Sequence, residues 1–163
     1  MKIRHETPAD VRKIRSTVTA AFRDAEHAGG NEAQIIDSLR EASALSVSLV
    51  ADDGDEVVGH VAFSPVQMSS GDINWYGLGP VSVIPSKQRQ GIAERLIRAG
   101  LQQIKELGAR GCVVLGDPDY YCRFGFKSDP DLHFADVPPE YFQRLVMDGE
   151  PPKGFVSYDP SFV

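Results

Sequence analysis

The chain contains 163 residues, of which 42% are hydrophobic and 25% are charged, enough for one folded domain whose core needs neither metals nor disulfides. Seventeen Lys and Arg against 23 Asp and Glu give a formal net charge of −6, which argues against binding to nucleic acid or to an anionic membrane surface. The N-terminal residues contain no apolar stretch of signal-peptide length and no apolar run can span a bilayer, so we expect a cytoplasmic protein without membrane partners.

A short strand and two amphipathic helices are predicted at the start of the chain. Residues 2–5 favour the strand, and Thr7 followed by Pro8 is typical of an N-cap and a first helical position. Apolar residues then recur at helical spacing as far as Phe22, so one face of this helix is expected to pack inward. Asn31 is placed to cap a second helix with the same kind of apolar face.

Three strands in an antiparallel meander are predicted next. Residues 46–51 favour a strand and lead into residues 52–55, Asp-Asp-Gly-Asp, a strong hairpin signal. Residues 56–66 form the expected return strand. A second turn, at residues 69–72, leads to a third strand over residues 75–84.

The chain then changes from strands to a long helix. Pro85 ends the preceding strand, and residues 91–107 carry apolar side chains at the spacing of an amphipathic helix. Gly108 is placed to cap the C-terminus of this helix. The apolar run 112–115 suits a buried strand parallel to the one before the helix, so we expect a β-α-β unit here.

A short helix and a proline-rich tail complete the predicted elements. Asp117 followed by proline is typical of a helix start, and this helix is expected to run to Arg123. The tail begins near Ser128. Within it we predict a helix over residues 140–146 and a last strand over residues 155–158.

The polar turn before the long helix carries the most informative chemistry. A helix N-terminus presents free backbone N–H groups and a partial positive charge, which together form an anion site. Gly91 lets a phosphate approach the backbone, Ala93 keeps the next turn small, and Lys87 and Arg89 add cationic donors. The turn has neither the G-x-x-x-x-G-K-[ST] pattern nor the three spaced glycines of a dinucleotide site. Taken alone, it is equally compatible with an ordinary strand–turn–helix junction.

Two separated motifs resemble those of a known family. Gln88-x-x-Gly91-x-Ala93 resembles the Q/R-x-x-G-x-G/A motif of the GNAT superfamily of acyl-CoA-dependent N-acetyltransferases. The preceding string from Leu78 to Pro85 resembles the bacterial branch of broad or unassigned substrate. Downstream, the segment Tyr121–Phe126 is similar to the F-Y-x-K-x-G-F segment that closes the same fold. The resemblance extends from Lys2 to Phe126.

The resemblance implies an α/β (α+β) fold of the GNAT type. Such a fold has a mixed, mostly antiparallel central sheet of about six to seven strands, with helices on both faces and a central β-α-β unit that binds CoA. One domain over residues 1–163 is expected, in which residues 128–163 form a C-terminal extension that completes the sheet. This extension is longer than in a minimal family member, so we expect it to shape the acceptor pocket or a contact within a homodimer.

The activity implied by the resemblance is transfer of an acetyl group from acetyl-CoA to a primary amine of a small molecule or peptide, directly within a ternary complex. The alternatives are a module that binds acyl-CoA without catalysis and a transferase of a longer acyl group. The amine itself is not specified by the sequence. In the family, backbone amides of the turn hold the CoA pyrophosphate and the preceding strand pairs with the pantetheine amides. The cofactor-binding residues implied by this match are Val81, Ser82, Val83, Gln88, Arg89, Gln90, Gly91, Ile92 and Ala93.

Tyr121 is the implied catalytic residue, because family members have a tyrosine at this position that can protonate the departing CoA thiolate. A phenol, with an ordinary pKa of about 10, stays protonated at neutral pH and can donate its proton. The alternative is a core tyrosine with a satisfied hydroxyl. Tyr120 is expected to be a packing residue. The loop before Tyr121 departs from the family pattern, since it lacks an Asn that often contacts the cofactor.

Other reactive groups are expected to be structural. Cys112 and Cys122 have neither metal-site nor disulfide spacing. Cys112 is predicted to be a core residue, and Cys122 a structural thiol rather than the nucleophile of an acyl-enzyme. His60 is a candidate base only if it faces the cleft and is otherwise a structural or surface residue. We therefore predict no metal, and no general base is identified.

Overall fold

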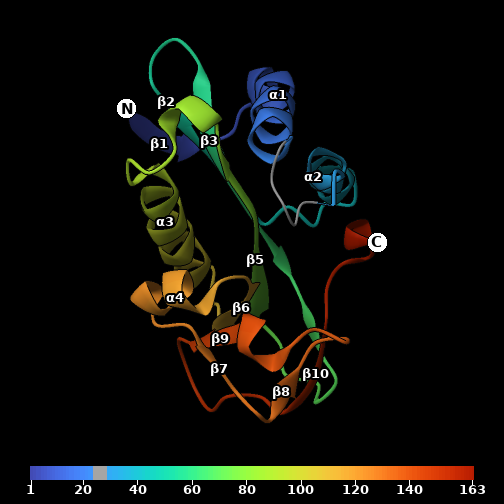
Figure 1. The fold of residues 1–163 in the computed structure, drawn as a ribbon. Coiled ribbons are helices and arrows are strands. Elements are labelled where there is room, and N and C mark those ends of the chain that lie inside the picture. The colour runs from blue at the N-terminus through green and yellow to red at the C-terminus, as the bar shows by residue number, and fades with distance from the viewer. Residues whose placement is uncertain (24–28) are drawn as a thin grey trace.

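The computed structural model describes residues 1–23 and 29–163. Its main feature is a seven-stranded sheet in which β5 and β6 are parallel and the other neighbouring strands are antiparallel, as predicted. A smaller sheet has the order β4-β10-β8 and consists of Gln67–Met68, Gly154–Ser157 and Leu132–His133 (Figure 1). The main sheet has the order β1 (Lys2–His5), β2 (Val47–Asp52), β3 (Val57–Pro65), β5 (Trp75–Val83), β6 (Gly111–Leu115), β9 (Phe142–Val146) and β7 (Lys127–Ser128).

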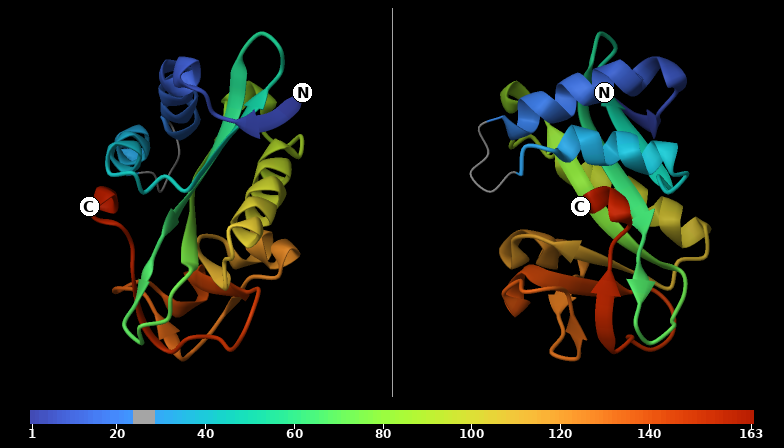
Figure 2. Two further views of the ribbon diagram at one scale, coloured as in Figure 1. Left: turned by 180° about the vertical axis from the view of Figure 1, so that it is seen from behind. Right: turned by 90° about the vertical axis from the view of Figure 1, so that its right-hand side faces the viewer.

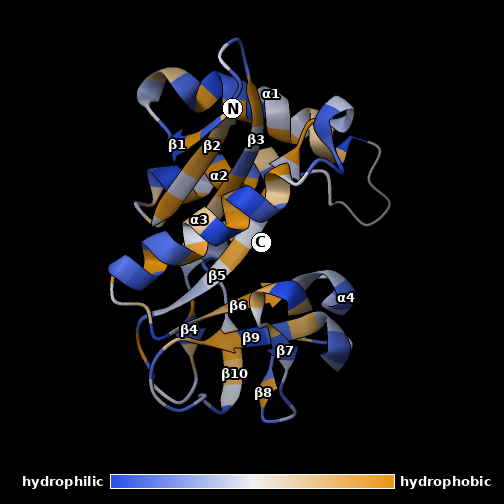
Figure 3. Cartoon of the chain, turned by 90° about the vertical axis from the view of Figure 1, so that its left-hand side faces the viewer, coloured by the Kyte–Doolittle hydropathy of each residue, from blue (hydrophilic) through white to orange (hydrophobic). Residues whose placement is uncertain are grey.

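Helices cover both faces of the main sheet, which confirms the expected layering. Figure 2 shows α1, α2 and the C-terminus on one side of the sheet and α3 on the other. Figure 3 shows hydrophobic strands in the interior and hydrophilic residues on the outer side of α3. No helix in the described ranges is long and apolar enough to cross a membrane. The helices are α1 (Val11–Phe22), α2 (Glu32–Glu41), α3 (Ile92–Glu106) and α4 (Pro118–Tyr121).

A buried carboxylate ties the first strand to the first helix. Asp10 accepts hydrogen bonds from Arg4 Nη1 at 2.7 Å and from the backbone N–H of Thr7, the predicted N-cap, at 2.7 Å. The Arg4 guanidinium holds the pKa of the Asp10 carboxyl well below its usual range.

Asn31 stands before α2 as predicted, but its side chain makes no capping bond with the described residues. Its backbone carbonyl accepts from the N–H of Ile35 at 2.9 Å.

Strand β5 positions the site because its neighbours change along its length. Its first half pairs with β6 in parallel register, from Trp75–Gly111 to Leu78–Val114. Beyond that point β5 still pairs with β3 as far as Val83. Its other edge has no strand partner in the described part of the chain. Residues 79–83 therefore present free backbone groups where the two parallel strands diverge.

One predicted element is wrong, because residues 140–146 do not form a helix. After a short 3-10 turn, strand β9 lies between β6 and β7 in the main sheet. Phe142 packs into the smaller hydrophobic cluster, whereas Leu145 packs against the main core. Alternation between faces is a strand pattern, and an apolar run this short does not distinguish a strand from a helix by sequence alone. The predicted strand at residues 155–158 is present as β10, but it joins the smaller sheet.

Candidate functional site

A cleft of about 440 Å³ opens where β5 ends and α3 begins, and we call it the turn cleft. Eight of the nine residues predicted to bind the cofactor line it. The ninth, Gln90, is absent from the described lining, and its side-chain Nε2 lies 3.5 Å from the carbonyl oxygen of Ser86. The full lining consists of Val81, Ser82, Val83, Lys87, Gln88, Arg89, Gly91, Ile92, Ala93, Glu94, Tyr120 and Arg123.

The turn takes its shape from left-handed backbone at two positions. Arg89 has φ 63° and Gly91 has φ 84°, a conformation that glycine adopts without a Cβ penalty. The Gln88 side chain donates from Nε2 to the carbonyl of Val83 at 2.9 Å and so fixes the turn against the end of β5. A Cβ added at Gly91 would meet no described atom within 4 Å. The first N–H groups of α3 thus adjoin open space, as an anion site requires.

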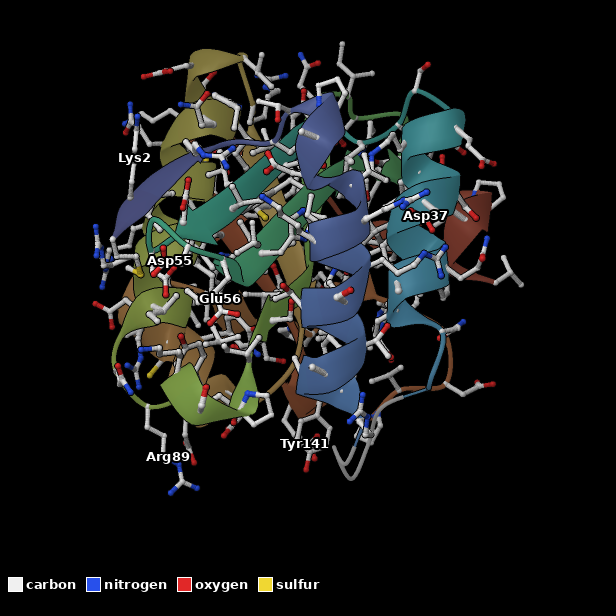
Figure 4. The ribbon with its side chains drawn as sticks, turned by 90° about the horizontal axis from the view of Figure 1, so that it is seen from above. Lys2, Asp37, Asp55, Glu56, Arg89 and Tyr141 are labelled. Atoms are coloured by element: carbon white, nitrogen blue, oxygen red, sulfur yellow. The ribbon has the colours of Figure 1, made fainter. Side chains whose placement is uncertain are left out.

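Charged side chains of both signs surround the turn cleft. Arg89 extends outward from the end of the turn (Figure 4). Glu94 accepts from Arg98 at 3.3 Å and from Arg123 at 3.2 Å, and these guanidinium groups hold the pKa of its carboxyl below the usual range. The Arg123 guanidinium also lies 4.3 Å from the centre of the Tyr120 ring. Neither Glu94 nor Arg123 was predicted from the sequence to belong to the site, although both lie in or beside the two family motifs.

A second cleft, of about 470 Å³, lies on the side of β5 that α1 and α2 cover, and we call it the aromatic cleft. Val81 lines both clefts, so they meet at the free edge of β5. Tyr121 lines the aromatic cleft, whereas its neighbour Tyr120 lines the turn cleft. The full lining consists of Phe22, Glu32, Leu78, Gly79, Pro80, Val81, Leu115, Tyr121, Phe134, Tyr158 and Phe162.

Tyr121 is held in a tight aromatic setting at the end of α4. Its ring meets Tyr120 edge-on at 5.1 Å and Phe126 at 6.0 Å between ring centres. A Cβ at Gly116 would lie 2.5 Å from the Tyr121 ring, so this position leaves room only for glycine. Burial, with a smaller effect from Tyr120, raises the pKa of Tyr121 to about 12. The phenol is therefore protonated across the neutral range.

The remaining reactive groups lie outside both described linings. His60 is fully buried in β3, its Nε2 lies 2.8 Å from Ser48 Oγ, and burial lowers its pKa to about 4. This is the structural histidine that we expected if the ring did not face the cleft. Cys112 is buried, and burial raises the pKa of its thiol. Cys122 is exposed, with its Sγ 3.4 Å from the carbonyl oxygen of Asp119. Among the described residues, no cluster of three or more His, Cys, Asp or Glu is placed to hold a metal ion.

Residues 2–128 match the family model of the acetyltransferase (GNAT) domain. The chain is 40% identical over 128 residues to the Escherichia coli protein named uncharacterized N-acetyltransferase YhbS. These aligned residues cover 78% of this chain and 74% of that protein.

Two solved structures have the same architecture over nearly the whole chain. A GNAT family acetyltransferase from Brucella melitensis, in complex with acetyl-CoA, has a TM-score of 0.89 and 46% identity, covering 99% of this chain and 97% of that one. The structure of E. coli YhbS in complex with CoA has a TM-score of 0.89 and 33% identity, covering 99% of this chain and 91% of that one.

Proposed function

The chain belongs to the GNAT acetyltransferase family and is an acyltransferase, and we propose that it transfers an acetyl group from acetyl-CoA to a primary amine of a small molecule or peptide. The transfer is direct, within a ternary complex. The observation that carries this proposal is the meeting of two clefts at Val81. Direct transfer needs donor and acceptor bound at once with their reacting atoms in contact. Two clefts that share Val81 would hold donor and acceptor next to each other, which supports this proposal.

The turn cleft fits CoA through its backbone. The N–H groups from Gln88 to Ala93 suit the pyrophosphate, because Gly91 leaves the approach open and α3 contributes its positive end. The free edge of β5, from Val81 to Val83, suits the pantetheine amides, which would add to the sheet like a strand. The Brucella and E. coli relatives form complexes with acetyl-CoA and CoA, which supports CoA as the ligand.

In this proposal, Tyr121 protonates the leaving group. Bound acetyl-CoA supplies a thioester, whose C–S bond breaks as the new C–N bond to the amine forms. Tyr121 gives its phenolic proton to the departing sulfur, and the proton lost by the amine nitrogen returns to the phenol through solvent. The low-polarity surroundings that raise the pKa of Tyr121 also disfavour release of a free thiolate. Proton transfer moves the negative charge to the phenol, and the return of the amine proton then neutralises the phenolate.

The positions of the two thiols support direct transfer over an acyl-enzyme. Cys122 is outside the described lining of both clefts. Cys112 is fully buried, and its raised pKa keeps it as an unreactive thiol.

The proposal is tested by screening amines and short peptides with acetyl-CoA and detecting acetylated products by mass. We expect a product, initial rates typical of a sequential mechanism, and no acetylated protein in intact-mass spectra when the acceptor is left out. Binding of acetyl-CoA without any acetylated product would indicate a module that binds without catalysis. A faster reaction with butyryl-CoA than with acetyl-CoA would indicate the longer-chain alternative. An acetylated cysteine that turns over would contradict direct transfer.

A further inference from the structure

The aromatic cleft is walled by rings from segments far apart in the sequence. Phe22 ends α1, Phe134 follows β8, and Tyr158 and Phe162 come from the C-terminal residues after β10. The rings of Phe134 and Tyr158 meet at 5.0 Å between centres, and those of Tyr158 and Phe162 at 5.2 Å. The 3-10 turn that carries Phe162 contacts α2. Because the last three of these rings pack against one another, this part of the wall exists before any ligand binds.

Aliphatic side chains extend this wall to the point where acetyl transfer would occur. Leu78 lies at the last paired position between β5 and β6, and Leu115 ends β6. Leu115 is 46% exposed. Both residues line the cleft together with Tyr121. An apolar ligand that reaches Tyr121 would therefore cover a leucine that water otherwise contacts.

Glu32 is the one charged residue among the described residues that line the aromatic cleft. It is the first residue of α2, and its Oε2 accepts from the backbone N–H of Gly29 at 2.9 Å. A carboxylate in a wall of rings attracts a cationic ligand and repels a ligand that carries its own carboxylate. The chain's net charge of −6 favours the same sign of ligand.

A buried hydroxyl gives the cleft a second polar feature. The Tyr158 hydroxyl is buried and has no hydrogen-bond partner among the described residues. A buried hydroxyl without a partner is unusual in a native protein and calls for an explanation. Tyr158 lines the cleft, so a ligand whose binding moves this ring would give the hydroxyl such a partner.

From these walls we infer that the aromatic cleft binds a small primary amine whose body is an aromatic ring or a branched apolar group, and that Glu32 attracts its protonated form. The extra ammonium proton passes to solvent before the neutral nitrogen attacks the thioester. The inference rests on the proposed function and names the acceptor class of the same site. The cleft volume of about 470 Å³ falls within the range of about 300–1,000 Å³ usual for small-molecule sites. Specificity thus comes from Glu32 and the rings, whereas the acetyl donor is held elsewhere.

The first experiment compares four acceptors with acetyl-CoA: phenethylamine, phenylalanine, putrescine and a lysine-containing tripeptide. Phenethylamine has the ring and the charge, phenylalanine adds a carboxylate, and putrescine lacks the ring. We expect kcat/KM for phenethylamine to exceed that of each other acceptor by about tenfold or more. Equal rates for phenylalanine would overturn charge selection, and a preference for putrescine or the peptide would overturn the apolar body.

The second experiment removes the charge and keeps the shape. Glu32→Gln should raise KM for phenethylamine by about tenfold, since a charge-assisted contact is lost, with the affinity for acetyl-CoA unchanged. The same variant should also reduce the ratio of kcat/KM for phenethylamine to kcat/KM for phenylalanine. Glu41→Gln, at the exposed other end of α2, is the matched control. An unchanged KM in Glu32→Gln, or an equal rise in Glu41→Gln, would overturn the role of Glu32.

The apolar wall has its own matched pair. Leu115→Ser should raise KM for phenethylamine by about three- to tenfold through lost apolar contact. Leu107→Ser, at a leucine that is 57% exposed at the end of α3, should leave KM unchanged. Equal KM values in the two variants would contradict the apolar wall.

Calorimetry separates this inference from the proposed function. Phenethylamine is titrated into the protein saturated with CoA, so that no turnover is needed. Binding that weakens in Glu32→Gln supports the acceptor class even if no product forms, in which case the proposed transfer alone fails. Absence of phenethylamine binding in a protein that acetylates other amines overturns the acceptor class alone.

Discussion

The two clefts that meet at Val81 are built in different ways. Ten of the twelve described residues that line the turn cleft come from one continuous stretch, residues 81–94, where a strand, a turn and a helix follow each other. The aromatic cleft collects its lining from Phe22 to Phe162, almost the length of the chain. The family match ends at residue 128, before three of its four rings besides Tyr121. Donor binding is therefore encoded locally, whereas acceptor binding depends on long-range packing.

This contrast predicts that variants on the two sides have separable effects. Changes in the turn should alter the affinity for acetyl-CoA alone, and changes in the aromatic wall should alter KM for the amine alone. Tyr121 lines the aromatic cleft together with Val81, where the two clefts meet, and its hydroxyl should affect the rate and neither binding constant. A variant in one cleft that changes both the affinity for acetyl-CoA and KM for the amine would contradict this separation of the two clefts.

The largest effect is expected for Tyr121→Phe, which keeps the ring and removes the proton. We expect kcat to fall by at least about 100-fold when chemistry limits the rate, as for loss of a general acid. The affinity for acetyl-CoA should change little. Tyr120→Phe, one residue away and facing the turn cleft, should keep its kcat. Wild-type turnover in Tyr121→Phe would make the tyrosine structural and leave water or the acceptor to supply the proton.

The pH dependence gives an independent test of the same group. Tyr121 acts in its protonated form, so its contribution is lost as pH rises through its pKa. Burial raises that pKa to about 12, so kcat should not decline from phenol ionisation between pH 8 and about 10.5. A decline centred near pH 10 that disappears in Tyr121→Phe would show an ordinary, solvated phenol instead.

A smaller effect is expected for Gly91→Val, at the start of α3. A β-branched residue is strained at φ 84°, and its side chain enters the space needed by the pyrophosphate. Acetyl-CoA affinity measured by calorimetry should fall by about tenfold, or about 1.4 kcal/mol. Gly108→Val is the matched control, because Gly108 has φ 90° at the other end of the same helix. Equal losses of affinity in both variants would trace the effect to helix strain rather than to the cleft.

Two glutamines in the turn provide a finer comparison. Gln88→Ala removes the hydrogen bond to the carbonyl of Val83, so the turn should be held less firmly and acetyl-CoA affinity should fall by about threefold. Gln90→Ala should leave the affinity unchanged, because Gln90 is exposed and outside the described lining. A larger loss of acetyl-CoA affinity in Gln90→Ala than in Gln88→Ala would show that the Gln90 side chain contributes to binding. It would also contradict the role of Gln88 in holding the turn.

What the sequence can predict follows the same division. The strands and helices up to Phe126, and the turn at Gly91, follow from local periodicity and turn residues, except for the two-residue strand β4, which was not predicted. Strand β9 does not, because its alternation has meaning only once β6 and β7 lie on either side. Arg123 contacts Tyr120 nearby in the sequence, but its contact with Glu94, 29 residues away, joins it to the start of α3. No local pattern brings such residues together, since packing between elements decides it.

The smallest effect, and the one whose sign is most informative, is expected for Tyr158→Phe. A buried hydroxyl without a partner costs about 1–3 kcal/mol, so its removal should leave the free energy of unfolding unchanged or raise it by up to about 1 kcal/mol. If the hydroxyl serves a ligand in the aromatic cleft, the same variant should raise KM for the amine by about two- to threefold. Urea unfolding and initial rates measure the two quantities on one preparation. A higher free energy of unfolding together with a higher KM for the amine would mean that the aromatic cleft keeps an unsatisfied hydroxyl for acceptor binding. The turn cleft differs, because it binds its ligand through backbone N–H groups at the start of α3. A loss of stability with unchanged KM would show that the hydroxyl is satisfied by water and plays no part in acceptor binding.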